Sequence, residues 1–220
     1  MKKFDYLLFI KKLNLFFAGL WIIQTGVAVF IKANIGSDPF TVFTQGLAKL
    51  LNITTGQANL VILCTFFIII LLTSRKSINI GTILAVLSAG LFIDLMSSVL
   101  DKVSFDSYNI LVKCIILFLG CVIIAIGFSM LMSANLGVAP NDLIPLIIQE
   151  KLKFQYRWIR ITLDLSFLVI GFLLGGIVGI GTIIAALCQG PTIQYFMPKV
   201  DKILKPFLKE TVNKDSVLTE

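Results

Sequence analysis

Long apolar runs separated by short polar or basic segments dominate the 220-residue chain. Six runs approach the ~20 residues that an α-helix needs to cross a bilayer, at about 13–33, 57–73, 78–100, 109–133, 159–175 and 179–198. Two further segments, 39–51 and 140–152, have 13 residues each and begin with proline, which favours the first turn of a helix. The pattern predicts an all-α integral membrane protein with six spanning helices and two short helices, each broken or re-entrant; for the short segments, helices lying in the membrane interface are the alternative.

The pattern repeats after about 100 residues. Residues 80–85 (IGTILA) match 180–185 (IGTIIA), and Ala-Asn-Ile-Gly at 33–36, followed by Pro39, matches Ala-Asn-Leu-Gly at 134–137, followed by Pro140. We therefore expect residues 1–103 to form a first membrane repeat, 104–200 a second one and 201–220 a charged cytoplasmic tail. With three spans in each repeat, the second copy enters the membrane upside down, which gives a 3+3 inverted repeat.

Composition and charge support a membrane location. Hydrophobic residues make up 57% of the chain and charged residues 14%, whereas soluble domains contain about 25% charged residues. Lys and Arg flank the apolar runs instead of forming a basic stripe, so nucleic acid is not an expected partner. Most of them fall on the side of the two chain ends, which predicts cytoplasmic N- and C-termini. Eight spans, with both short segments crossing, fit the charges equally well.

Residues suited to catalysis or metal binding are scarce. The chain has no histidine, and its four cysteines lie inside apolar runs without a Cys-x-x-Cys pair. Small apolar packing residues are the expected role of such cysteines. We therefore expect no cofactor, no metal and no enzymatic activity.

The two matching Asn-Gly-Pro elements are the candidate solute site. Glycine permits a tight turn, proline sets the first helical residue, and asparagine offers an amide to a ligand. Self-capping of the short helices is the alternative explanation. The predicted substrate-binding residues are those of both elements and two glutamines within apolar runs: Asn34, Gly36, Asp38, Pro39, Asn135, Gly137, Pro140, Asn141, Asp142, Gln24 and Gln189. The carboxylates among them favour a cationic or zwitterionic solute over a free anion.

Asp94 and Asp164 fall inside predicted spans and are the candidates for binding a coupling ion, because carboxylates at bilayer depth usually face a cavity or a partner. Two structural explanations stand beside this role. Asp164 follows Arg160 by four residues, a spacing that permits an ion pair along one helix face. Asp94 has no basic residue within a helical turn, so a position near the outer headgroups is its alternative.

The Ala-Asn-(Ile/Leu)-Gly-x-x-Pro segments, the glycine-rich stretch from Gly175 to Thr182 and the dipeptide Gly190-Pro191 resemble the YczE/YyaS/YitT-type family of bacterial integral membrane proteins. The similarity runs from about Gly19 to Pro198 and is strongest to the YczE branch, because no soluble domain follows the last span. It implies a multi-pass protein of the bacterial plasma (inner) membrane.

A secondary transporter or permease for a small polar solute, cationic or zwitterionic, is the function that this pattern favours. A substrate-binding subunit of a larger uptake complex and a membrane accessory or assembly protein without transport activity are the alternatives. The expected partners are the lipid bilayer and an unidentified small-molecule solute, together with a homo-oligomer or a partner subunit as further possibilities.

Overall fold

The computed structural model describes residues 6–154 and 156–208 as helices joined by short linkers, with no strand among them. The α-helices are α1 (Tyr6–Ala33), α2 (Pro39–Leu51), α3 (Thr55–Ser74), α4 (Ile80–Leu100), α5 (Ile110–Ala134), α6 (Pro140–Leu152), α7 (Tyr156–Leu173) and α8 (Ile180–Leu208). Two 3-10 turns, η1 (Arg75–Ser77) and η2 (Phe105–Ser107), join α3 to α4 and α4 to α5. The short helices predicted at 39–51 and 140–152 have the same bounds as α2 and α6.

Local sequence sets the ends of these helices. Asn34 and Asn135 follow α1 and α5 with φ of 58° and 51°, a left-handed conformation that asparagine tolerates and that ends a helix. Gly36 and Gly137 continue each linker at φ of 107° and 112°, where a side chain would be strained. A proline then starts each short helix. Both linkers therefore turn the chain sharply for the same reason.

Helices α1 and α5 pack closely against each other in antiparallel orientation. A Cβ atom at Gly19 would lie 2.8 Å from the Gly127 carbonyl oxygen, and one at Gly26 would lie 3.0 Å from that of Gly120. Phe16 and Phe30 are completely or almost completely buried on either side of this crossing. Small residues thus allow the two backbones to touch, as in closely packed membrane helices.

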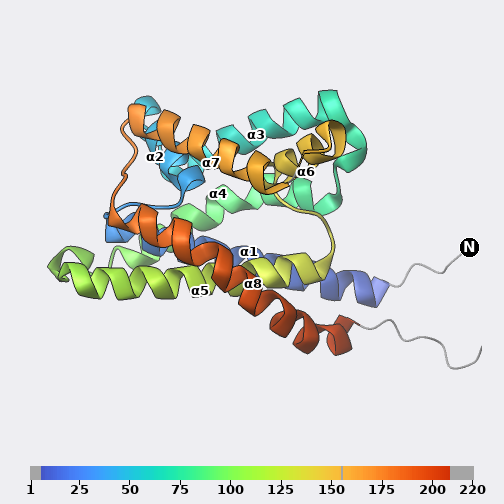
Figure 1. Cartoon of the computed structure of the whole chain (residues 1–220). Helices are drawn as coiled ribbons and strands as arrows, with labels where there is room; N and C mark the ends of the chain where they lie inside the picture. Colours follow the sequence, from blue (N-terminus) through green and yellow to red (C-terminus); the bar gives the residue numbers. More distant parts are fainter. Residues whose placement is uncertain (1–5, 155, 209–220) are drawn as a thin grey trace, which may run out of the picture.

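The two short helices lie at opposite ends of the bundle (Figure 1). At the α2 end, the ion pair Lys32–Asp101 links α1 to the residue after α4. At the α6 end, Lys151 donates a hydrogen bond to the Thr73 carbonyl oxygen over 3.0 Å. The side chain of Thr54, just after α2, bonds to Asp94 near the end of α4, so α2 begins and ends at the same end of the bundle.

The two linkers dock reciprocally onto the helices of the other half of the chain. The Ile35 carbonyl oxygen accepts a 2.7 Å hydrogen bond from the Gly181 N–H at the start of α8. The Leu136 carbonyl oxygen accepts a 2.8 Å hydrogen bond from the Gly81 N–H at the start of α4. The equivalent residues are separated by 100 or 101 positions, so the same interaction is made twice, once at each end of the bundle.

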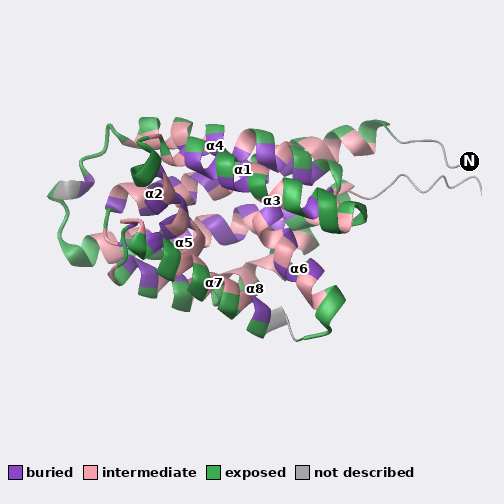
Figure 2. Cartoon of the chain, turned by 90° about the horizontal axis from the view of Figure 1, so that it is seen from above, coloured by how far each residue is buried: buried purple, intermediate pink, exposed green. Residues whose placement is uncertain are grey.

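Four helices of the described chain are long and apolar enough to cross a membrane: α1, α3 with the turn that follows it, α4 and α5. Large apolar side chains point outward from them, such as Leu72, Leu91 and Leu111, which are 81%, 68% and 71% exposed. Figure 2 shows buried positions gathered along α1, α4 and α5, with exposed positions on the outward faces. This distribution suits a protein whose outer surface faces lipid.

Helices α7 and α8 cover the remaining two predicted spans, but they are less apolar. Arg160 and Asp164 interrupt α7. Helix α8 contains three prolines and continues to Leu208, so the segment 201–220 that was predicted as a tail starts as helix. Its residues 209–220, like residues 1–5, lie outside the described part of the chain. The predicted spans at 159–175 and 179–198 are thus helical, with a composition that alone does not mark them as membrane-spanning.

Candidate functional site

A cavity of about 780 Å³ lies between the helices, and side chains from all eight of them line it. Its wall is predominantly apolar, with residues such as Ile23, Phe128 and Leu165. Charged and amide side chains interrupt this wall in two groups. Small-molecule sites have this character, a largely apolar enclosure of several hundred Å³ with a few placed polar groups.

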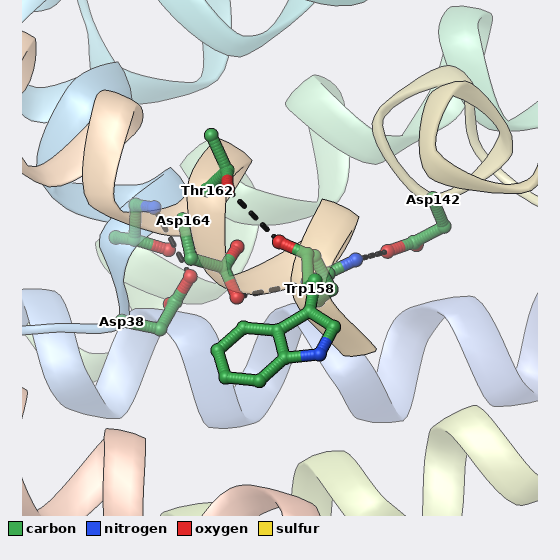
Figure 3. Close-up of polar contacts among 7 residues, drawn as sticks. Asp38, Asp142, Trp158, Thr162 and Asp164 are labelled. Carbon is green, nitrogen blue, oxygen red and sulfur yellow. Dashed lines mark hydrogen bonds and ion pairs between the residues drawn. The ribbon is translucent and has the colours of Figure 1, made fainter. Parts of the chain in front are cut away.

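The charged group consists of Asp38, Asp142, Arg160 and Asp164. The Arg160 guanidinium donates from one terminal nitrogen to Asp142 over 2.9 Å and from Nε to Asp164 over 3.1 Å. It thereby joins α6 to α7, and Figure 3 labels its two partners, Asp142 and Asp164. The predicted i,i+4 ion pair of Asp164 is present, and Asp142 extends it across two helices.

Asp38 occupies the linker before α2 and caps that helix, because its carboxylate accepts the Thr41 N–H over 3.1 Å. Its charge also interacts with that of Arg160. Burial raises the pKa of the Asp38 carboxyl above its usual value, while the Thr41 hydrogen bonds and the Arg160 charge act in the opposite direction. With all four groups ionised, the cluster carries a net charge of −2, since one guanidinium faces three carboxylates.

Four amide side chains form the second group: Gln24, Asn59, Asn141 and Gln189. Gln24 and Asn59 are only 7% and 4% exposed. Asn59 is not among the predicted binding residues. Asn59 stands 101 positions before Arg160, close to the spacing of the repeated segments in the sequence.

The structure brings together six of the eleven predicted binding residues. Gln24, Asp38, Pro39, Asn141, Asp142 and Gln189 all line the cavity. Asn34 and Asn135 do not: both are exposed and end α1 and α5. Gly36 and Gly137 instead pack against the first turns of α8 and α4, and Pro140 is buried at the start of α6.

The two candidate coupling residues separate. Asp164 lines the cavity, whereas Asp94 lies outside it. The Asp94 carboxylate accepts the Thr54 hydroxyl over 2.5 Å and the Gly56 N–H over 2.9 Å. Asp94 therefore holds the start of α3 against α4, and it forms no ion pair with a basic side chain of the described residues. Within the described residues, no group of three or more Cys, Asp or Glu side chains could hold a metal ion.

Comparison with known proteins defines the class. The chain belongs to a family of unknown function, DUF6198, whose model matches residues 10–198. The chain is 30% identical over 190 residues to the uncharacterized membrane protein YczE of Bacillus subtilis, covering 86% of each chain. It is 29% identical over 185 residues to the uncharacterized protein YyaS of the same organism, covering 84% of this chain and 91% of YyaS.

A third relative, an uncharacterized protein of Haemophilus influenzae, is 26% identical over 187 residues, covering 85% of this chain and 84% of the relative. No solved structure matches the chain. The predicted resemblance to YczE and YyaS is confirmed, and the protein is a membrane protein of that family.

Proposed function

We propose that the protein is a secondary transporter for a small cationic or zwitterionic solute in the bacterial plasma membrane. The cavity carries this proposal, because it is large enough for a small organic molecule and has more carboxylates than cations in its wall. A buried excess of negative charge attracts a positively charged group strongly, since little water screens it.

The solute would enter between the Asp38 carboxylate and the Asp164 carboxylate, both of which face the cavity. Arg160 fixes Asp164 and Asp142 in place and gives a zwitterion a counter-charge for its own carboxylate. Of the two predicted coupling residues, Asp164 is the one in contact with the cavity, so we place ion coupling there. No enzymatic activity is part of the proposal.

The contacts at the bundle ends support six spans, and the excess of Lys and Arg on the side of the chain ends supports cytoplasmic termini. Helix α2 begins after Ile35, which contacts the start of α8, and ends before Thr54, which contacts the end of α4. Both contacts lie at one end of the bundle. Helix α6 begins after Leu136, which contacts Gly81, and its Lys151 reaches Thr73 at the other end. Neither short helix crosses the bundle, which favours re-entrant helices over an eight-span arrangement.

An inverted repeat accounts for these observations together. The antiparallel α1–α5 crossing and the reciprocal linker bonds are what a pseudo-two-fold axis in the membrane plane would produce. The cavity would then lie on that axis, between two halves of the same fold. Alternating access follows naturally, because exchanging the conformations of the halves opens the site to the opposite side.

The experiment uses the purified protein in proteoliposomes on a solid-supported membrane, exposed to a panel of amines and amino acids. We expect at least one solute to evoke a transport current in the wild type, and Asp38→Asn and Asp164→Asn to abolish it. Asp101→Asn is the matched control, because it neutralises a carboxylate whose ion pair lies at the bundle end, outside the cavity.

Unchanged currents in both cavity variants would refute the proposed site, and the absence of binding or current for every cation and zwitterion would refute the function. Solute binding without any current would instead favour the substrate-binding subunit of an uptake complex.

A further inference from the structure

We propose that the solute is an amine that also carries neutral hydrogen-bonding groups, hydroxyl or amide, recognised by the side chains of Gln24 and Asn59. The inference rests on the proposed function and adds a second element of recognition to the same cavity. It also distinguishes the solute from a simple alkylamine, which offers an ammonium group and nothing else.

The two amides are buried and have no hydrogen-bond partner within the described residues. Gln24 on α1 and Asn59 on α3 are more than nine-tenths buried, and both line the cavity. A buried amide without a partner destabilises a protein, so native structures almost always satisfy one. The cavity is the place from which these two amides can obtain their partners.

Several other polar side chains in the bundle are satisfied locally, and the three buried hydroxyls that lack a partner among the described residues, those of Ser37, Ser74 and Thr82, lie outside the cavity. Ser129 donates to the Ala125 carbonyl oxygen over 2.6 Å, and Thr44 donates to that of Phe40 over 2.9 Å. Hydroxyls in membrane helices commonly bond back to their own helix in this way. The amide side chains of Gln24 and Asn59 make no such bond and also line the cavity, and this combination distinguishes them from the buried hydroxyls.

The two buried amides, Gln24 and Asn59, lie on different helices from the ion-paired charges. The guanidinium and two of the carboxylates belong to α6 and α7, whereas Gln24 and Asn59 belong to α1 and α3. In the repeat, Asn59 corresponds to Arg160, so a neutral amide stands where the other half has a charge. A ligand that satisfies both groups is polar along its length, with an ammonium group toward the carboxylates and a hydroxyl or amide group toward Gln24 and Asn59.

An amide is well suited to this second role, because it offers both N–H donors and a carbonyl acceptor. Hydroxyl and amide groups on the solute can use both. A site that hydrogen-bonds a solute hydroxyl discriminates against an analogue that lacks it, because the amides of the site are then left unpaired.

The first experiment needs no ligand. Gln24→Met and Asn59→Leu keep approximate shape and remove the hydrogen-bonding groups. If the amides are held for a ligand, the ligand-free variants should melt in detergent at the wild-type temperature or above it, since binding-site residues are often not optimal for stability. Ser129→Ala is the matched control and should melt lower, because it loses a satisfied buried bond. A decrease for both amide variants as large as that of Ser129→Ala would overturn the inference.

The second experiment compares n-pentylamine with 5-amino-1-pentanol by calorimetric titration of the detergent-solubilised protein. We expect the amino alcohol to bind about fivefold to tenfold tighter to the wild type, the effect of about one additional hydrogen bond. In the double variant Gln24→Met/Asn59→Leu that preference should vanish while pentylamine affinity is retained. Equal affinities in the wild type, or a preference that persists in the double variant, would overturn the role of the amides. Failure of both amines to bind the wild type would overturn this inference about the solute, whereas the proposed function is refuted only by the full panel of amines and amino acids described above.

Discussion

The linker between α1 and α2 packs tightly against the start of α8, so adding one methyl group there, in Gly181→Ala, should lower the stability of the protein strongly. A Cβ at this position would meet the Gly36 carbonyl oxygen well inside the 3.0 Å that real Cβ atoms keep, and Leu117 Cδ1 at 2.8 Å. The first of these atoms is backbone, so the linker and α8 must move apart. That movement also stretches the 2.7 Å hydrogen bond from the Gly181 N–H to Ile35.

The magnitude follows from these two terms. Overpacking in a tight interior costs about 1–3 kcal/mol, and the weakened hydrogen bond adds about 1 kcal/mol. We therefore expect Gly181→Ala to lower stability by about 2–4 kcal/mol. For a chain of this length, a loss of that size corresponds to a decrease in Tm of roughly 5–15 °C.

Two further glycines give a graded comparison. A Cβ at Gly81 would lie 2.8 Å from both the Leu136 carbonyl oxygen and Phe16, a milder clash, so Gly81→Ala should be less destabilising than Gly181→Ala. A Cβ at Gly190, also in α8, would meet nothing within 4 Å. Gly190→Ala should therefore raise stability by about 0.5–1 kcal/mol through helix propensity alone.

The assay is thermal unfolding in detergent, followed with a thiol-reactive dye that labels the four helix-embedded cysteines as the bundle opens. The expected order of melting temperatures is Gly190→Ala, wild type, Gly81→Ala and Gly181→Ala, from highest to lowest. Equal melting temperatures for Gly181→Ala and Gly190→Ala would refute the close docking of the linker on α8.

Two other predictions concern Asp94 and the topology. Asp94→Leu removes the carboxylate that accepts hydrogen bonds from Thr54 and Gly56 at the start of α3, and should lower the free energy of unfolding by about 2–3 kcal/mol. The transport current in proteoliposomes should persist. Loss of the current in well-folded protein would restore Asp94 as a coupling residue. For topology, single cysteines replace the exposed residues Ser104 and Lys76 in a variant that lacks the native cysteines. When whole cells are treated with a membrane-impermeant thiol reagent, the cysteine at 104 should react and the cysteine at 76 should not. Labelling at Lys76 would refute six spans with cytoplasmic termini.

The apolar pattern was sufficient to predict the helices. A long continuous apolar run in a membrane has to form a helix, because only a helix satisfies all the backbone hydrogen bonds within one segment. Proline after a glycine-containing turn marked the starts of α2 and α6 at Pro39 and Pro140. These features are local: they depend on hydropathy, on φ restriction and on backbone hydrogen bonds within a few residues. The same locality explains why the i,i+4 pair of Arg160 and Asp164 was visible in the sequence.

The tertiary structure decided which polar residues face the cavity. Asn34 and Asn135 looked like ligand groups because they stand in the repeated motif, yet their left-handed φ places them at exposed helix ends. Asn59 carries no motif and faces the cavity. Whether a polar side chain points into a cavity depends on how α1, α3, α6 and α7 are rotated against one another. Those rotations are fixed by contacts between residues far apart in the chain, so the local sequence does not reveal them. Sequence therefore determined which segments are helical and where the short helices α2 and α6 begin and end, and only the packing determined which polar groups meet.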